Sequence, residues 1–167
     1  MSFKFELLST QRLSGYRFDC GIEILNRYLF YQAKQDVKRK VAAVYILKDI
    51  DQKSIVGFYT LSSTNLRLTE LPDQFIKKLP KYPLVPATLI GRLAIDLKYN
   101  GGGFGRVLMI DAIKKSVSTS LSIGSAAIVV EAKNDEAQNL YKKFGFFILN
   151  ESKLCLPMAT AILLLQA

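Results

Sequence analysis

The chain has 167 residues, half of them apolar, and its 23 Lys and Arg residues against 14 Asp and Glu give a net charge of +9. This length suits a single domain, and the apolar fraction is high enough for a buried core, which excludes a disordered chain. The chain contains no histidine. This excludes Ser-His-Asp triads, Cys-His dyads and zinc sites with histidine ligands, and we expect no metal. The basic excess favours an anionic partner such as nucleic acid.

The two cysteines, Cys20 and Cys155, are too few for a disulfide framework and form no CxxC pair. We expect both to be ordinary buried residues. The N-terminal residues lack the apolar stretch of a signal peptide, and the longest apolar run, near Pro157 to Leu165, is too short to span a bilayer. We therefore expect a cytoplasmic protein with reduced thiols and no membrane partner.

In chain order, the first half predicts a strand, a helix and a hairpin. Phe3 to Leu8 alternates apolar and polar residues, as a strand does. Apolar residues then recur at helical spacing from Ile22 to about Val37. The segments Val41 to Leu47 and Ser54 to Ser63 are rich in β-branched and aromatic residues, and the polar stretch between them indicates an antiparallel hairpin. A short helix is expected over Leu71 to Lys81, before a loop with three prolines.

The second half predicts an alternation of strands and helices. We expect strands over Thr88 to Asp96 and Ala126 to Ala132, and helices from about Gly103 to Val117 and over Asp135 to Phe144. A last strand is expected over Leu154 to Leu164, in which Pro157 marks the place where a break would fall. This order predicts an α/β fold with a mixed central sheet of six or seven strands and helices on both faces, in one domain over residues 1–167.

A glycine-rich segment, Asn100 to Arg106, lies between an expected strand and an expected helix. Glycine allows positive φ and close approach of a ligand, and exposed N–H groups at a helix N-terminus suit a pyrophosphate. Arg106 would add charge at its edge. A glycine-rich turn without a ligand explains the segment alone equally well. A P-loop is excluded because Gly105 is followed by Arg106 and Val107 instead of lysine and a hydroxyl residue. The late position of the segment disfavours a dinucleotide loop.

Two motifs in this half resemble those of the GNAT acetyltransferases. The acetyl-CoA loop of that family reads Gln/Arg-x-x-Gly-x-Gly/Ala; Gly103 and Gly105 match its small positions, whereas Asn100 stands where Gln or Arg is usual. A second pattern, Asn-x-x-Ala-x-x-x-Tyr-x-x-x-Gly-Phe, is matched in full. Its members here are Asn134, Ala137, Tyr141, Gly145 and Phe146. The resemblance implies the GNAT fold and acetyl-CoA as the donor.

Further segments, spread along most of the chain, are similar to the GNAT toxins of bacterial toxin–antitoxin pairs. They are Arg17 to Gly21, Gly57 to Ser62, Gly91 to Asp96 and Leu156 to Met158. This resemblance implies an enzyme that acetylates the α-amine of aminoacyl-tRNA and thereby blocks translation. It also implies a ribbon-helix-helix antitoxin, which neutralises the toxin and binds the operator with it, and a homodimer.

The resemblance to GNAT enzymes implies roles for individual residues. Tyr141 would be the general acid for the leaving thiolate; without the motif, it reads as one member of an apolar helical stripe. Asn134 would bind the pantetheine side of the cofactor. Three strand residues would pair with the pantetheine arm and thioester: Leu93, Ala94 and Ile95. Backbone N–H groups of the loop would hold the pyrophosphate: those of Gly101, Gly102, Gly103, Phe104, Gly105 and Arg106.

The strand Thr88 to Ile95 carries no carboxylate that could act as a general base. At pH 7 a lysine with a pKa of about 10.4 loses a proton at a cost near 4.6 kcal/mol, whereas an α-amine near 7.7–8.0 costs only about 1–1.4 kcal/mol. A site without a strong base therefore fits an α-amine better. A water chain, Glu131 or Asp96 stays open as the base, and we expect the amine to attack acetyl-CoA directly in a ternary complex.

Basic residues form two clusters, each of which is either a solvated face or a contact for tRNA phosphates. The first consists of Lys34, Lys38, Arg39 and Lys40, and the second of Lys77, Lys78 and Lys81. Arg92 alternates with Leu93 along its strand and is a candidate for the acceptor cleft. Two other functions stay open: a GNAT enzyme for a protein N-terminus or a small amine, and an inactive GNAT fold that binds a partner in a repressor complex.

Overall fold

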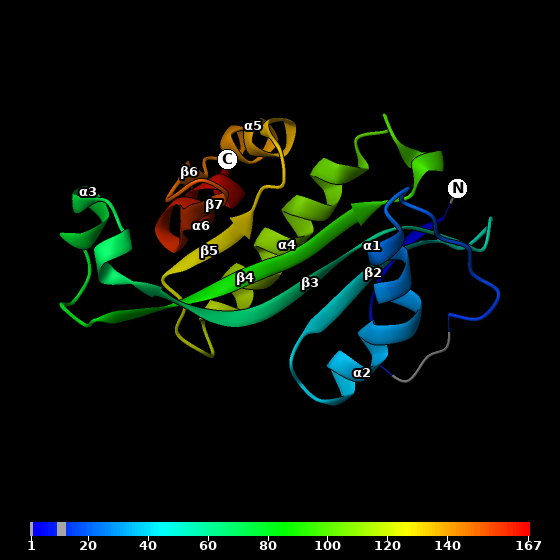
Figure 1. Ribbon diagram of the computed structural model, residues 1–167, viewed down its shortest axis with the longest axis horizontal. Coiled ribbons are helices and arrows are strands. Elements are labelled where there is room, and N and C mark those ends of the chain that lie inside the picture. Colours follow the sequence, from blue (N-terminus) through cyan, green and yellow to red (C-terminus); the bar gives the residue numbers. More distant parts are fainter. Residues whose placement is uncertain (1, 10–12) are drawn as a thin grey trace. The chain divides into compact units, whose positions relative to one another are not determined.

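A computed structural model describes residues 2–9 and 13–167 (Figure 1). The strands are β1 (Phe3–Leu7), β2 (Ala43–Asp49), β3 (Ser54–Arg67), β4 (Leu84–Ile95), β5 (Ala127–Glu131), β6 (Phe147–Ile148) and β7 (Lys153–Pro157). They form a seven-stranded sheet in the order β1-β2-β3-β4-β5-β7-β6. β4 and β5 are parallel, whereas β1–β2, β2–β3, β5–β7 and β6–β7 are antiparallel. The expected mixed α/β sheet is therefore confirmed.

Six α-helices and three shorter helical turns accompany the strands in the described part of the chain. The helices are α1 (Glu23–Arg27), α2 (Ala33–Lys38), α3 (Asp73–Ile76), α4 (Phe104–Ser120), α5 (Asp135–Lys143) and α6 (Met158–Gln166). The turns are the π-helix η1 (Tyr28–Gln32) and the 3₁₀ turns η2 (Leu68–Glu70) and η3 (Leu97–Tyr99). Within the described residues, no helix is long and apolar enough to cross a membrane.

The chain folds into two compact units. The first contains the residues up to Ser62 together with Gly91–Ala112, and the second contains Ser63–Ile90 together with Ile113–Ala167. β3, β4 and α4 each contribute residues to both units.

In the first unit, helices lie on both faces of the antiparallel strands β1, β2 and β3 (Figure 1). On one face, side chains of α1, η1 and α2 pack against the strands in a single core cluster. Its members are Leu8, Phe18, Leu25, Tyr28, Leu29, Ala33, Val44, Ile46, Ile55, Phe58 and Ala94. On the other face, the Tyr59 hydroxyl donates a hydrogen bond of 2.5 Å to Oδ2 of Asp111 in α4. Burial and this hydrogen bond raise the pKa of Tyr59 far above its usual value of about 10.

The helix expected from Ile22 to Val37 is present, but a π-turn interrupts it. The N–H of Ala33 donates to the carbonyl of Tyr28, five residues earlier, and both side chains are buried. An interval of five residues between two buried positions does not match the period of an α-helix. The π-turn absorbs the extra residue and keeps both side chains on the core.

In the second unit, a buried central strand carries the core. β5 pairs in parallel with β4 from Thr88↔Ile128 to Ile90↔Val130, and antiparallel with β7. Residues 127–130 of β5 are all buried, as expected for an apolar, β-branched strand covered on both faces. The core cluster of this unit consists of Leu66, Leu71, Val85, Ala87, Ala127, Val129 and Cys155.

The expected last strand is wrong beyond Pro157. β7 ends at this proline, and Met158–Gln166 form α6. Pro157 takes the N-cap position with φ −57° and ψ 142°, where its missing N–H costs nothing. Met, Ala, Leu and Gln, which fill most of α6, are strong helix formers, and an uninterrupted apolar run has no periodicity that separates a strand from a helix. The helix expected over Leu71 to Lys81 is also shorter than expected, because α3 covers only Asp73–Ile76.

Gly57 lies in close contact with β4 and α4 within the first unit. A Cβ atom added to it would lie 2.6 Å from the carbonyl oxygen of Ala94 and 2.7 Å from Cδ1 of Leu108. We expect Gly57→Ala to lower the free energy of unfolding by about 1–3 kcal/mol, the usual cost of overpacking, as measured by urea denaturation. Gly124→Ala is the control, because its Cβ would meet nothing within 4 Å. Equal stability of the two variants would contradict this close contact.

Candidate functional site

The carboxylate of Asp96 holds the chain in place where β4 ends. Its Oδ2 accepts a hydrogen bond of 2.8 Å from the backbone N–H of Asp19, and its Oδ1 accepts one of 2.8 Å from that of Lys98. The N–H of Asp96 donates to the carbonyl of Val56, and that of Leu97 donates to the carbonyl of Asp19. Since Asp96 is buried and both oxygens are engaged, it is a structural acceptor and not an available general base.

The glycine-rich segment forms a turn that leads into α4. Gly101 has φ 81° and Gly103 has φ 79°, in the left-handed region that favours glycine. A Cβ atom at either position would meet nothing within 4 Å, so the backbone conformation and not a lack of space demands glycine here. The turn is open to a ligand.

α4 begins directly after this turn and is 17 residues long. The N–H of Val107 donates a hydrogen bond of 3.2 Å to the carbonyl of Gly103, and the helix dipole makes this end of α4 positive. Phe104, the first residue of α4, packs its ring against those of Phe3 and Tyr99, with centroids 5.1 and 5.6 Å apart. Tyr99 is held in turn by a hydrogen bond of 2.7 Å from its hydroxyl to Oδ2 of Asp49. The segment can therefore bind an anion such as a pyrophosphate.

The strand residues expected to hold the thioester also belong to the first unit. Ala94 is buried in its core, whereas Leu93 and Ile95 are partly buried. The backbone N–H of Arg92 donates a hydrogen bond of 3.0 Å to the Thr60 hydroxyl oxygen. The Arg92 guanidinium lies 3.7 Å above the centre of the Tyr28 ring, on the side of β4 that also carries Ala94.

The second motif forms α5 in the second unit, and several of its residues define the ends of this helix. The Asn134 side chain accepts a hydrogen bond of 2.8 Å from the N–H of Ala137, as an N-cap does. At the other end, Gly145 has φ 101° and its N–H donates to Lys142, while the N–H of Phe146 donates to Tyr141. These bonds form a Schellman motif, in which glycine takes the left-handed position.

Tyr141 is partly buried near the end of α5. Its ring centroid lies 5.9 Å from that of Phe146. Burial raises the pKa of the Tyr141 phenol above its usual value of about 10. The phenol therefore stays protonated at neutral pH, which is the state required of a proton donor.

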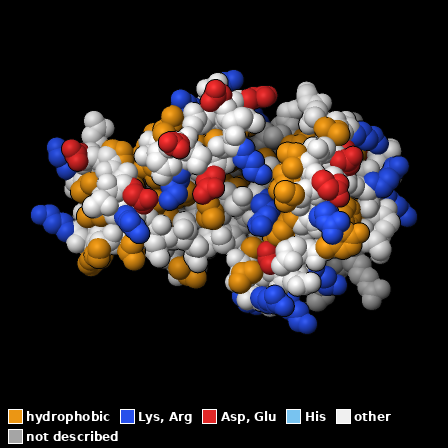
Figure 2. Space-filling model, in the orientation of Figure 1, with side chains coloured by type: hydrophobic (Ala, Val, Ile, Leu, Met, Phe, Trp, Pro, Cys, Tyr) orange, Lys and Arg blue, Asp and Glu red, His pale blue; other side chains and the backbone are white. Residues whose placement is uncertain are grey.

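The first basic cluster is exposed at the end of α2. Figure 2 shows a group of Lys and Arg side chains there, and the residues are Lys34, Lys38, Arg39 and Lys40. Lys77, Lys78 and Lys81 are exposed in the second unit. Arg92 belongs to neither surface cluster, because its guanidinium is stacked on Tyr28.

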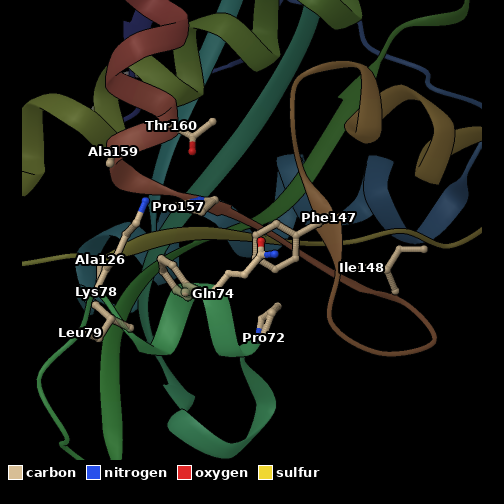
Figure 3. A pocket seen from close by; sticks show the side chains of 11 residues that line it. Pro72, Gln74, Lys78, Leu79, Ala126, Phe147, Ile148, Pro157, Ala159 and Thr160 are labelled. Carbon is tan, nitrogen blue, oxygen red and sulfur yellow. The ribbon is translucent and has the colours of Figure 1, made fainter.

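A cavity of about 690 Å³ lies in the second unit (Figure 3). α3 and its following turn line one part of it, through residues that include Phe75, Lys78 and Leu79, while Phe147 and Thr160 line another. No residue of the two motifs lines it. The sequence carries no sign of this cavity, because its residues come from separate segments with no motif of their own. In the described ranges, no group of three or more Cys, Asp and Glu residues is placed to hold a metal ion.

The two thiols differ in their surroundings. Cys155 is buried, which confirms the expectation for this residue, and burial raises its pKa to about 12. Cys20 is only partly buried. We expect one thiol of the native protein to react with a disulfide reagent such as DTNB at pH 7.5, and both thiols to react after unfolding, since the thiolate is the reactive form. Cys20→Ser should abolish the native reaction; a persistent reaction in this variant would show that Cys155 is accessible.

Residues 10–146 match the model of the acetyltransferase (GNAT) family. A probable toxin TacT of Sinorhizobium fredii is 27% identical over 164 residues, which cover 93% of this chain and 91% of that protein. A tRNA-acetylating toxin of Mycobacterium tuberculosis is 40% identical over 94 residues, covering 56% of this chain and 55% of that protein.

Two solved structures extend the similarity to almost the whole chain. AtaT complexed with acetyl-methionyl-tRNAfMet has a TM-score of 0.87 and 32% identity, covering 98% of this chain and 99% of that one. A mutant of the toxin AtaT bound to the C-terminus of the antitoxin AtaR and acetyl-CoA has a TM-score of 0.77 and 29% identity, covering all of both chains.

Proposed function

The chain belongs to the acetyltransferase (GNAT) family, and on that premise we propose that it moves an acetyl group from acetyl-CoA to the α-amine of aminoacyl-tRNA and thereby blocks translation. The single observation that carries the donor assignment is the open glycine turn at the N-terminus of α4. The similarity to AtaT complexed with acetyl-methionyl-tRNAfMet supports the acceptor. In this proposal residues 1–167 act as one catalytic domain.

The donor would bind along the end of β4 and the turn that follows. Backbone N–H groups of Gly101 and of the segment from Gly103 to Arg106 would hold the pyrophosphate, and the helix dipole of α4 would add favourable charge. The N–H of Gly102 already donates to the carbonyl of Tyr99. The backbone of Leu93 to Ile95 would pair with the pantetheine arm. Asn134 is assigned to the pantetheine side through its Nδ2 group, because its Oδ1 already caps α5.

In the transfer step, the amine nitrogen attacks the thioester carbonyl carbon, a C–N bond forms and the C–S bond breaks. The electron pair of that bond goes to sulfur, Tyr141 donates its phenolic proton to the thiolate, and the nitrogen releases its extra proton to water. Solvent then returns a proton to the phenolate. Burial disfavours the charged phenolate and so favours this return. Transfer is direct, so an acetyl-enzyme trapped by rapid quenching would contradict this step.

An α-amine acceptor needs no strong base, and among the described residues one of the two candidate bases, Asp96, is already engaged. Asp96 is engaged by two backbone N–H groups, and Glu131 is exposed at the end of β5. An α-amine near pKa 7.7–8.0 needs only about 1–1.4 kcal/mol to lose its proton at pH 7, against near 4.6 kcal/mol for lysine. Water is a sufficient proton acceptor for the α-amine.

The partners that complete this proposal are an antitoxin and a second copy of the chain. AtaT has been solved with the C-terminus of the antitoxin AtaR, and by analogy we assign a ribbon-helix-helix antitoxin to this chain. The enzyme would work as a homodimer in the cytoplasm, where charged tRNA is used.

We expect Tyr141→Phe to lower the rate of acetyl transfer from labelled acetyl-CoA to total charged tRNA by about 10²–10⁴-fold, because a general acid contributes that much. Affinity for acetyl-CoA should stay unchanged. Tyr82→Phe is the matched control, since Tyr82 is 65% exposed in a loop, and it should keep full activity. Label on the aminoacyl end that persists in Tyr141→Phe would contradict the assignment of the general acid.

The pH profile tests the same residue. The rate constant should rise from pH 6.5 to 8.5 as the α-amine loses its proton, and should fall only above about 10, since burial raises the pKa of Tyr141 above that value. Transfer to peptides or small amines but not to charged tRNA would keep the donor site and discard the tRNA acceptor. A chain that does not bind acetyl-CoA at all would be an inactive binding module.

The basic cluster on α2 should contribute to tRNA affinity through counterion release. We expect the triple variant Lys38→Ala, Arg39→Ala and Lys40→Ala to flatten the plot of log K against log salt by about 0.7–0.9 for each phosphate that it no longer neutralises. The comparison variant removes Lys77, Lys78 and Lys81 in the same way, which takes the same charge from the second unit. An unchanged slope in the first variant would exclude these three residues from phosphate contacts, and equal flattening in both variants would show that the tRNA does not distinguish the two clusters.

A further inference from the structure

Arg92 is held by groups from two other elements of the first unit, β3 and η1. Its backbone is tied to β3 through the hydrogen bond to the Thr60 hydroxyl. Its guanidinium lies 3.7 Å from the ring centre of Tyr28, a cation–π contact with a residue of η1. The side chain is partly buried. A stacked arginine loses little further freedom when it binds a ligand, because the plane of the guanidinium is already fixed.

Tyr28 is held in place by a hydrogen bond to Asp36 and by stacking on Phe58. Its hydroxyl donates a hydrogen bond of 2.9 Å to Oδ2 of Asp36, and the Gln32 amide donates one of 2.9 Å to Oδ1 of the same carboxylate. The ring stacks on Phe58 with centroids 6.1 Å apart. Tyr28 is 5% exposed, and burial raises the pKa of its phenol well above the usual value. It therefore presents a neutral, immobile ring face to Arg92.

The π-turn is the device that brings Tyr28 and Asp36 together. An α-helix advances about 100° per residue, so two residues eight positions apart would point roughly 80° away from each other. The extra residue absorbed by η1 reduces this angle to about 20°, and the carboxylate reaches the hydroxyl. π-turns inside helices occur frequently at functional sites, although they are less favourable than regular α-helix.

This arrangement leaves the edges of the guanidinium available. A guanidinium carries five N–H donors around its rim, and stacking on Tyr28 occupies only a face. No Asp or Glu in residues 2–9 and 13–167 forms an ion pair with Arg92, and the nearby Asp36 carboxylate is engaged by Tyr28 and Gln32. A planar fork of free donors on a fixed base is suited to an anion with two oxygens, such as a phosphate group.

We propose that Arg92, stacked on Tyr28, binds a phosphodiester near the 3′ end of the acceptor RNA strand and so positions the aminoacyl group for transfer. Arg92 directly precedes Leu93, the first strand residue assigned to the thioester, and a strand advances only about 3.3 Å per residue. The backbone of Arg92 therefore adjoins the strand segment assigned to the donor, and its guanidinium lies on the face of β4 that carries Ala94. This step rests on the proposed function for the place of the donor. Arg92 is a positioning residue here, and Tyr28 and Asp36 act through it.

Arg92→Lys tests the site, because it keeps the charge and removes the planar fork. The probe is a fluorescently labelled RNA minihelix ending in CCA, titrated by anisotropy at several salt concentrations. We expect the Kd to rise at least tenfold because the planar fork is lost, while the slope of log K against log salt changes little because the charge is kept, with an unchanged Kd for acetyl-CoA. Arg27→Lys is the matched control: Arg27 lies 5.5 Å above the ring of Tyr31, which is 70% exposed. Its Kd should stay within twofold of the wild type.

A second pair of variants tests the hydrogen bond that holds Tyr28 in its position against Arg92. Tyr28→Phe keeps the ring and removes the hydrogen bond to Asp36, and we expect a rise in Kd of about threefold, with Tyr31→Phe as the control. Thermal melts report whether each variant is folded. An RNA affinity within twofold of the wild type for folded Arg92→Lys would overturn the proposal. So would a loss of acetyl-CoA affinity in that variant, or an equal effect of Arg27→Lys.

The same titrations separate this proposal from the proposed function. If the wild type acetylates charged tRNA and Arg92→Lys does so with an unchanged KM, the phosphate site is overturned and the function stands. If the wild type binds the minihelix through Arg92 but transfers no acetyl group to charged tRNA, the phosphate site stands and the function is overturned. If Arg92→Lys lowers binding of an acidic peptide but not of RNA, the site takes a carboxylate and the proposal fails.

Discussion

The buried carboxylate of Asp96 determines where β4 stops, and the geometry of the glycine turn depends on that point. Both of its oxygens accept backbone N–H groups, one from Asp19 and one from Lys98, so it joins the segment before α1 to the segment after β4. Without it, two partly buried N–H groups would lose their acceptors. The rings of Phe3, Tyr99 and Phe104 then hold the turn against β1. A phosphate cradle made of backbone N–H groups needs this support, since no side chain of its own glycines can position it.

The motif that forms α5 contains residues that build the helix together with the tyrosine that we propose as the general acid. Asn134 and Gly145 are the residues that begin and end this helix, through an N-cap and a Schellman motif. The position of Tyr141 follows from both ends, because a helix fixed at its caps presents each side chain in one direction. A pattern that marks a family of enzymes is therefore partly a pattern for building one short helix. In the proposed function, only the phenol of Tyr141 carries chemistry that the helix does not need.

The positive charge of the chain acts at two ranges in the proposed function. The exposed cluster at the end of α2 is surrounded by water and screened by salt, so it attracts nucleic acid without selecting a particular atom. Arg92 is partly buried and stacked on Tyr28, which gives its donors a fixed direction. The exposed cluster would speed the encounter with nucleic acid, because exposed charges attract it over a distance. Arg92 would align a bound phosphate, because its donors point in a fixed direction.

The sequence by itself determined the β2–β3 hairpin, the glycine turn, α5 and the family, because the periodicity, turn residues and caps that specify them lie within a few positions of one another. It did not determine α6, since the apolar run after Pro157 is compatible with a strand or a helix until its neighbours are known. Only the tertiary structure placed Arg92 on Tyr28, tied Tyr28 to Asp36 through a π-turn and engaged Asp96 with the chain before α1. The contacts of Arg92 and Asp96 join residues far apart in the chain. They depend on how the elements pack, and local propensity carries no information about that.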